Sequence, residues 1–477
     1  MGSRPPVGGH DAGEPPPDPP RLGRRTFLLG AAGLGAAGTG VALAGCSGGL
    51  AAPRAGGPGT VPVLTKPTVR FRAGHRPFPH RPAGTDMLPQ IRHIVVLMME
   101  NHSFDNYFGM LGRGDGFTLG SDGRPTNANP GPGGSPVVAY PASSVCQDGV
   151  EVSQSWVVSH GSWNHGRNDG FVTAKGSNDP MAYFGQKDLP FYYSLGRTFP
   201  LCDRWFSSTM AQTYPNRRFL IAGSAFGLVD DSYPQATSYR PGGFGTVFEL
   251  LDHYGITWRD YHTTLASGLL FPYLATSDAG NFKLIGQFFS DAASGRLPGF
   301  SLVEPNYQTG SEENPQDIQE GEAFAASVVD AVMRSPAWPS TVLVWLYDEH
   351  GGYYDHVPPV PAVPPDHILP DVPASELDGD HYSWTGFRVP AVVVSPWAKR
   401  DYVSHVVKDH TSILKLVETK WNLPALSDRD ANATNLLDTL DLTARRPPFL
   451  VPPSLTAAPA VSAAEDALCQ SLSPPGS

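Results

Sequence analysis

The sequence is short of charge and, in particular, of basic residues. Charged residues make up 17% of the 477 residues, and 45 acidic side chains outnumber 34 basic ones, giving a net charge of −11. Such a surface gives no electrostatic basis for binding nucleic acid, and we do not expect it to be drawn to anionic lipid. With 49 prolines as well, the composition predicts long ordered loops over one large core.

Cysteine is also scarce, with four residues in the chain. Cys146, Cys202 and Cys469 lie too far apart in sequence to have the spacing of metal ligands. One disulfide and one free thiol among these three would suit an exported protein, but the sequence does not choose the pair.

The most informative segment follows an apolar run, Thr341 to Tyr347 (TVLVWLY), which is typical of a buried strand. Directly after it come Asp348, Glu349 and His350, and then two glycines that allow a sharp turn. In open α/β folds, ligands bind at the carboxyl ends of the strands. The segment therefore predicts metal or phosphate chemistry, although a solvated turn would look similar.

A second segment has the same form. The apolar run over residues 91–99 (IRHIVVLMM) ends in Glu100, Asn101 and His102, with Asp105 three residues later. Each segment alone is compatible with a helix cap or turn, but together they predict oxygen ligands from two strands at one sheet edge.

A candidate nucleophile lies between these segments, in Thr213-Tyr-Pro215-Asn-Arg217. Thr213 is placed where a helix N-cap is expected, with Pro215 in the first turn. A hydroxyl at a helix N-terminus beside a cation can be held as an alkoxide, and the free N–H groups suit a phosphate oxygen. The alternative is that Thr213 only caps the helix.

Five motifs in this order resemble those of the bacterial phosphoesterase family. They are Glu100 to Gly109 (ENHSFDNYFG), Leu201 to Phe206 (LCDRWF), Thr213 to Arg217 (TYPNR), Asp348 to Val357 (DEHGGYYDHV) and Asp409 to Ile413 (DHTSI). This family contains phospholipases C and related acid phosphatases, and it belongs to the alkaline phosphatase superfamily. The resemblance runs from about Pro89 to Leu426.

The resemblance implies one divalent metal ion held by Glu100, Asn101, Thr213, Asp348 and Glu349. Thr213 would attack phosphorus to form a covalent phosphoenzyme, which water would then hydrolyse. Oxygen ligands favour Ca²⁺, Mg²⁺ or Mn²⁺, while the superfamily also allows zinc or iron. A threonine nucleophile is more typical of the phospholipase C branch. Supporting or substrate-binding roles are expected for Asn216, Arg217, Asn314, His350, Asp355, His356 and His410.

The acid that protonates the leaving group is harder to identify. His160 lies in a polar stretch that resembles the family segment supplying an active-site histidine, and His165 in the same loop is the second candidate. Relatives commonly have His-Pro where this chain has Asn314-Pro315, and an asparagine cannot act as an acid. Asp317 retains the acidic position and is a further catalytic candidate, or else only the first residue of a helix.

The N-terminus carries targeting signals. Arg24-Arg25-Thr-Phe27-Leu28-Leu29 resembles a twin-arginine export signal, followed by an Ala/Gly-rich stretch too weak and broken for a membrane span. Leu43-Ala-Gly-Cys46 resembles a lipobox, in which Cys46 is lipidated and becomes the first residue of the mature chain. Ordinary cleavage and release is the alternative.

These features divide the chain into a signal peptide (1–45), a Pro/Gly-rich tether (46–88), a single catalytic domain (89–445) and a tail expected to be disordered (446–477). Strand-like runs occur at Ile94 to Met99, Phe300 to Val303, Thr341 to Tyr347 and Val389 to Ser395. Helical periodicity occurs near Phe324 and over Ser412 to Trp421. This alternation predicts an α/β fold with a doubly wound, mostly parallel sheet between helices.

The sequence therefore predicts an exported, membrane-anchored and metal-dependent phosphoric ester hydrolase. A phospholipase C acting on phospholipid head groups is the first expectation and a phosphomonoesterase of acid phosphatase type the second. A non-catalytic, metal-binding surface lipoprotein stays open because of the departure at Asn314. The oligomeric state is not predicted.

Overall fold

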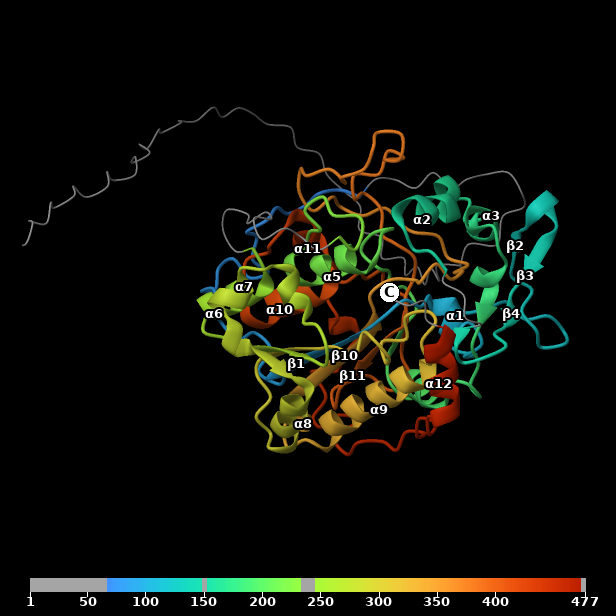
Figure 1. Cartoon of the computed structure of the whole chain (residues 1–477). Coiled ribbons are helices and arrows are strands. Elements are labelled where there is room, and N and C mark those ends of the chain that lie inside the picture. Colours follow the sequence, from blue (N-terminus) through green and yellow to red (C-terminus); the bar gives the residue numbers. More distant parts are fainter. Residues whose placement is uncertain (1–66, 148–151, 233–244, 473–477) are drawn as a thin grey trace, which may run out of the picture. The chain divides into compact units, whose positions relative to one another are not determined.

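The computed structural model describes residues 67–147, 152–232 and 245–472 (Figure 1). The predicted export signal and Cys46 lie outside these residues. Within them, none of the helices has the length and apolar character needed to cross a membrane.

A central sheet of eight strands organises the domain, in the order β12-β6-β11-β10-β1-β9-β7-β8. The strands are β1 (His93–Met99), β6 (Leu201–Cys202), β7 (Trp258–His262), β8 (Phe282–Leu284), β9 (Phe300–Val303), β10 (Thr341–Tyr347), β11 (Ala391–Val394) and β12 (Val403–Ser404). β1 pairs in parallel with β9 and β10, whereas β11 runs antiparallel to both of its neighbours. All residues of β10, and those of β1 after His93, are buried, as expected for strands covered on both faces.

Helices pack on both faces of this sheet (Figure 1). On one side lie α4 (Pro190–Thr198), α8 (Ile285–Ala293) and α9 (Ile318–Arg334); on the other lie α5 (Thr213–Ala222), α6 (Val247–His253), α10 (Thr411–Trp421) and α11 (Asp428–Asn432). α9 illustrates why a helix packs on the sheet, because its buried residues fall on one helical face. These residues are Ile318, Ala325, Val328, Val329 and Val332. The predicted α/β sheet between two helical layers is confirmed.

The remaining elements are short. They are α1 (Phe104–Phe108), α2 (Trp156–Trp163), α3 (Phe171–Lys175), α7 (Leu274–Ser277) and α12 (Ala463–Leu472), with β2 (Ala128–Pro130) paired to β3 (Pro136–Val138), and β4 (Tyr140–Pro141) paired to β5 (Ala182–Tyr183).

The part of the expected tether that the structure describes, residues 67–88, lies against the domain. The backbone N–H groups of Arg70 and Phe71 donate to Asn432 Oδ1 at 2.8 and 3.0 Å, and Gly74 N–H donates to the Ala425 carbonyl at 2.8 Å. The composition of this segment predicts no packing, because backbone hydrogen bonds to distant residues leave no local pattern.

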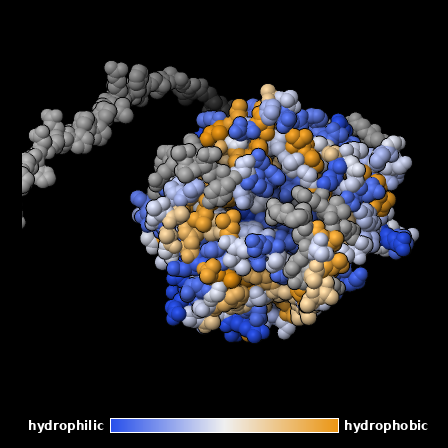
Figure 2. All heavy atoms as spheres, viewed as in Figure 1, coloured by the Kyte–Doolittle hydropathy of each residue, from blue (hydrophilic) through white to orange (hydrophobic). Residues whose placement is uncertain are grey.

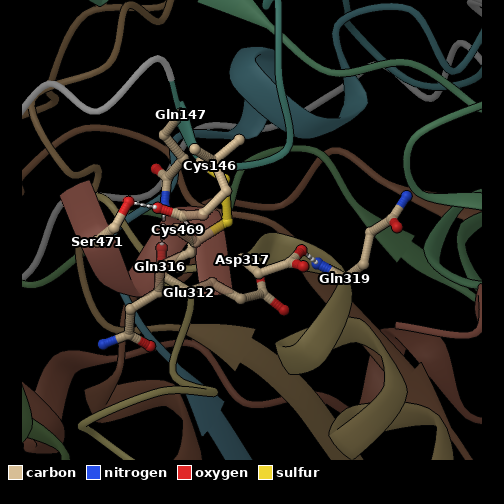
Figure 3. The surroundings of a disulfide bond; sticks show 9 residues. Cys146, Gln147, Glu312, Gln316, Asp317, Gln319, Cys469 and Ser471 are labelled. Carbon is tan, nitrogen blue, oxygen red and sulfur yellow. Dashed lines mark hydrogen bonds between the residues drawn. A yellow bond between two sulfur atoms is a disulfide. The ribbon is translucent and has the colours of Figure 1, made fainter. Parts of the chain in front are cut away.

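The C-terminal tail, expected to be disordered, also has structure. It contains α12, and Cys469 on this helix forms a disulfide with Cys146, which leaves Cys202 as a buried free thiol (Figure 3). Next to Cys146, the Gln147 amide donates to the carbonyls of Glu312 at 2.9 Å and Gln316 at 3.1 Å. The disulfide therefore ties α12 to the segment around Cys146, and Gln147 links that segment to the loop before α9.

Candidate active site

Two neighbouring strands bring the predicted ligands together. Met99 pairs with Tyr347 at the ends of β1 and β10, so Glu100 and Asp348 leave the sheet side by side. Asn101 follows in a left-handed conformation (φ 69°), and its N–H donates to Asp348 Oδ1 at 3.2 Å. A side chain at Gly351 would lie 1.9 Å from the Asn101 carbonyl oxygen, so this close approach of the two loops requires glycine.

Thr213 joins this group from the other side. Gln212 is the N-cap of α5 and Thr213 its first residue, so Thr213 is not the cap that the sequence predicts. Its hydroxyl is free of capping and donates to Asn101 Oδ1 at 3.3 Å.

Asn216 holds the loop that carries Thr213. Its amide oxygen accepts from Ser208 and Thr209 N–H at 2.9 and 3.1 Å, and its amide nitrogen donates to the Ala211 and Gln212 carbonyls at 3.0 Å. Asn216 thus fixes the backbone that carries the Thr213 hydroxyl, which is a supporting role.

The carboxylates of this cluster are suited to a cation. Glu100 Oε2 and Glu349 Oε1 are buried without a hydrogen-bond partner. Burial raises the pKa of both groups well above the usual value, and nearby carboxylates add to the rise. Buried oxygens left open in this way are what a metal ion would satisfy.

One arginine provides the only positive side chain among these ligands in the described part of the chain. Buried Arg217 contacts Asp348 Oδ2 at 3.1 Å and Glu100 Oε1 at 3.5 Å, and Glu304 lies 3.9 Å away. Despite its burial, Tyr307 and these carboxylates raise the pKa of Arg217. The guanidinium therefore offsets the charge of two of the three predicted carboxylate ligands, Glu100 and Asp348.

Histidines flank the cluster without facing the nucleophile. His410 Nε2 donates to the Asp348 carbonyl at 2.6 Å and so fixes that backbone. His350 lies 3.2 Å from Glu349 Oε2, and burial lowers its pKa to about 3, which keeps it neutral.

A cavity of about 290 Å³ opens onto Thr213. Its walls combine apolar and polar side chains from loops far apart in sequence: Glu100, Thr213, Tyr214, Arg217, Asp231, Leu265, Ser267, Leu270, Tyr307 and Glu313. Asp231, Ser267, Tyr307 and Glu313 are not predicted by the sequence, because each is a single polar residue in a loop with no motif around it.

Asp231 contacts the first turn of the helix that carries Thr213. Its Oδ1 accepts from Tyr214 N–H at 2.7 Å, one residue after Thr213. Burial raises the pKa of Asp231 to about 7, although the Tyr214 N–H opposes the rise. A carboxyl with this pKa can donate a proton near neutral pH.

The predicted acids lie elsewhere. His160 does not line the cavity: its Nδ1 is 2.8 Å from the Trp156 carbonyl and its Nε2 is 3.2 Å from Asp380. His165 is on the surface, 3.4 Å from Asp378. Asp317 is the N-cap of α9 and accepts from Gln319 N–H at 2.8 Å, which matches its alternative interpretation as a helix start. Asn314 donates to Tyr353 Oη at 2.7 Å.

A second group of ligand-type side chains lies further along the same two motifs. Asp105, Asp355 and His356 have atoms within 4.8 Å of one another, a spacing that could hold a metal ion. However, buried Arg388 contacts Asp355 Oδ1 at 2.8 Å and Asp105 Oδ1 at 3.1 Å, and His356 Nδ1 is 2.6 Å from Asp105 Oδ2. These contacts already pair the carboxylates of this group, so we expect Asp355 and His356 to support the fold.

The model of the Phosphoesterase family matches residues 91–424, which span all of these motifs. The chain belongs to the phosphoesterase family. It is therefore a phosphoric ester hydrolase.

Curated relatives match this chain over most of its length. Phospholipase C B from Mycobacterium tuberculosis is 30% identical over 77% of this chain and 80% of its own. Non-specific phospholipase C4 from Arabidopsis thaliana is 32% identical over 72% of this chain and 70% of its own. A solved protein of the alkaline phosphatase superfamily from Vibrio parahaemolyticus is 11% identical, covers 77% of this chain and 74% of that one, and gives a TM-score of 0.35.

Proposed function

We propose that this chain is a metal-dependent phospholipase C that uses Thr213 as its nucleophile. The observation that carries the proposal is Thr213, the first residue of α5. Its hydroxyl donates to Asn101, and it lines the cavity together with Glu100, which has one carboxylate oxygen without a partner. The names of the curated relatives support the phospholipase C assignment.

The proposed cation is held by Glu100, Asn101, Thr213, Asp348 and Glu349. When bound, it would neutralise charge on the phosphoryl oxygens and favour the Thr213 alkoxide. Asn101 orients the hydroxyl, and Arg217 supplies fixed positive charge at the cavity wall.

In the proposed reaction, the Thr213 oxygen forms a bond to phosphorus as the bond from phosphorus to the alcohol oxygen breaks. Asp231 donates a proton to that departing oxygen, in place of the predicted His160. Water then attacks the phosphothreonine, releasing the phosphorylated head group and restoring the hydroxyl. A cavity of about 290 Å³ suits the head group of a lipid whose acyl chains stay outside.

The test is hydrolysis of phosphorylcholine and phosphomonoester chromogenic substrates by the purified protein, with Thr213→Ala as the critical variant and Thr209→Ala as a neighbouring control. We expect Thr213→Ala to lose at least about a thousandfold in kcat/KM. Turnover that survives in Thr213→Ala would refute the nucleophile. A clear preference for the monoester would instead favour a phosphomonoesterase.

We further propose that the protein is exported through the twin-arginine pathway and anchored by lipid on Cys46. The sequence around Arg24, Arg25 and Cys46 supports this. Incorporation of labelled fatty acid into the wild type but not into Cys46→Ser would support the anchor, and release of unlabelled protein would favour simple secretion.

A further inference from the structure

The segment from Pro67 to Thr85 differs in charge from the rest of the molecule. It carries Arg70, Arg72, Arg76 and Arg81 and no acidic residue, in a chain whose net charge is −11. An average over the whole surface predicts no attraction to anionic lipid, but the average hides this local concentration of arginine.

Exposed apolar side chains accompany these arginines. Val69, Phe71 and Phe78 are 38%, 42% and 36% exposed, and Val406 and Val407 beside them are 37% and 45% exposed. Hydrophobic residues are scattered among hydrophilic ones on the face drawn in Figure 2, so exposure alone is ordinary. Arginine alternating with exposed aromatic and branched side chains is the combination that suits a membrane interface.

Hydrogen bonds and an ion pair hold this segment to the domain, and its apolar side chains are exposed. Asn432 accepts from the Arg70 and Phe71 backbones, and Arg72 pairs with Asp428 at 2.5 Å. A groove of about 580 Å³ runs beside it, lined among others by Arg70, Phe71, Phe78, Val406, Lys415 and Asp438. Val406 thus borders the same surface as Phe71.

Acidic groups near this surface already have partners. Asp428 pairs with Arg72, Asp438 with Lys408 at 3.0 Å, and Glu418 with Lys415 at 2.8 Å. Among the described residues, no carboxylate lies within ion-pair distance of the Arg70 or Arg81 guanidinium. Their charge is available to an external anion.

We propose that residues 69–81, together with Val406 and Val407, form a docking surface for anionic lipid membranes. Arginines contact the lipid phosphates while Phe71, Phe78 and the valines enter the interface. α10 connects the surface to the candidate site, because Lys415 and Thr419 line the groove and His410, before α10, holds Asp348. From His410 to Thr419, the helical rise amounts to about 14 Å.

The test measures binding of the full chain to vesicles by flotation, using phosphatidylcholine alone or with about one-third phosphatidylglycerol. Every protein carries Cys46→Ser, which removes any covalent lipid. Against the anionic vesicles, Arg70→Gln with Arg81→Gln should weaken binding about thirtyfold. The matched control, Arg124→Gln with Arg334→Gln, removes two exposed arginines elsewhere and should leave binding unchanged. An equal loss in both double variants, or no loss in the first, would overturn the proposal.

A site-specific signal distinguishes binding at this surface from binding by residues 1–66. An environment-sensitive fluorophore on His80→Cys should brighten with anionic vesicles, while the same label on Arg124→Cys should not; buried Cys202 stays unlabelled. No change at position 80, or binding to heparin without any fluorescence change on vesicles, would contradict a membrane surface. Neither measurement needs turnover, so the result is independent of whether the proposed activity is found.

Discussion

The two sequence motifs that end β1 and β10 each supply residues to two different clusters. Glu100 and Asp348 belong to one, around Thr213, and Asp105 and Asp355 belong to the other, around Arg388. The residue types are the same, but in the second cluster Arg388 and His356 satisfy the carboxylates, whereas Glu100 and Glu349 each keep a buried oxygen without a partner. The difference makes the cluster around Thr213 the candidate for a cation, because two of its buried oxygens have no partner, whereas the carboxylates around Arg388 are already paired.

The largest expected effect comes from exchanging one carboxylate for an amide in each cluster. Glu349→Gln should lose metal and at least about a thousandfold in kcat/KM, because a cation ligand is removed. Its stability in metal-free buffer should not fall, since Glu349 Oε1 has no protein partner and the amide oxygen of glutamine can still accept from Gly351 N–H. Asp355→Asn should keep its metal and lose stability instead. Elemental analysis and urea denaturation of both variants measure this contrast.

The opposite pattern would reverse the comparison. If Asp355→Asn emptied the protein of metal while Glu349→Gln retained it, the cation would belong to the Asp105 cluster, whose atoms lie within 4.8 Å of one another.

A second prediction concerns the arginine that pairs with the carboxylates of the second cluster. Arg388→Met should lower the free energy of unfolding by about 3–5 kcal/mol, because it leaves the buried Asp105 and Asp355 without their cation. Arg124→Met, at an exposed position, should change it by less than about 0.5 kcal/mol. Equal stability of the two variants in urea would show that the cluster is not held by Arg388.

The fold was largely predictable because it follows from long apolar runs. The strands at Phe300–Val303 and Thr341–Tyr347 have the predicted bounds, and the helix at Thr411–Trp421 begins one residue earlier than predicted. The strands at Leu201–Cys202 and Val403–Ser404 were missed, because two residues carry no periodicity.

The site was only partly predictable. The sequence predicts that Glu100 and Asp348 lie at one sheet edge, and they do, because each directly follows a buried strand and the two strands pair. Asp317 shows the limit, since an aspartate that caps a helix and one that donates a proton look identical in sequence. Asp231 could not be found, because its place beside Thr213 depends on one backbone contact between loops.

The two clusters should also differ in their response to pH. In the cluster around Arg388, pH should change the free energy of unfolding. Asp105 and Asp115 raise the pKa of His356 to about 9, against burial, from its usual 6.5. A raised pKa means that this stabilisation is complete below about pH 6.5 and is lost as pH rises through about 9. The loss should be roughly 3 kcal/mol. Urea denaturation at both pH values should show a smaller loss in His356→Gln than in the wild type. An equal loss in both proteins would assign the pH dependence to other groups.

The smallest expected effect concerns the cluster around Thr213, where Asp231 is the proposed proton donor. As a proton donor, Asp231 must be protonated, so turnover should fall as pH rises above its pKa of about 7. Asp231→Asn should remove this limb of the pH profile and slow hydrolysis of an alkyl phosphodiester about a hundredfold. A nitrophenyl ester should be affected little, because its leaving group departs without a proton.

The dependence on the leaving group is what distinguishes proton donation from simple support of the loop. If Asp231 only held Tyr214 in place, both esters would slow by the same factor, since Thr213 would be displaced for each substrate alike. His160→Gln is the matched comparison, because His160 is bonded to Asp380 away from the cavity and should affect neither ester selectively. A selective loss in His160→Gln, with none in Asp231→Asn, would identify His160 as the proton donor. The active site would then extend from Thr213 toward α2.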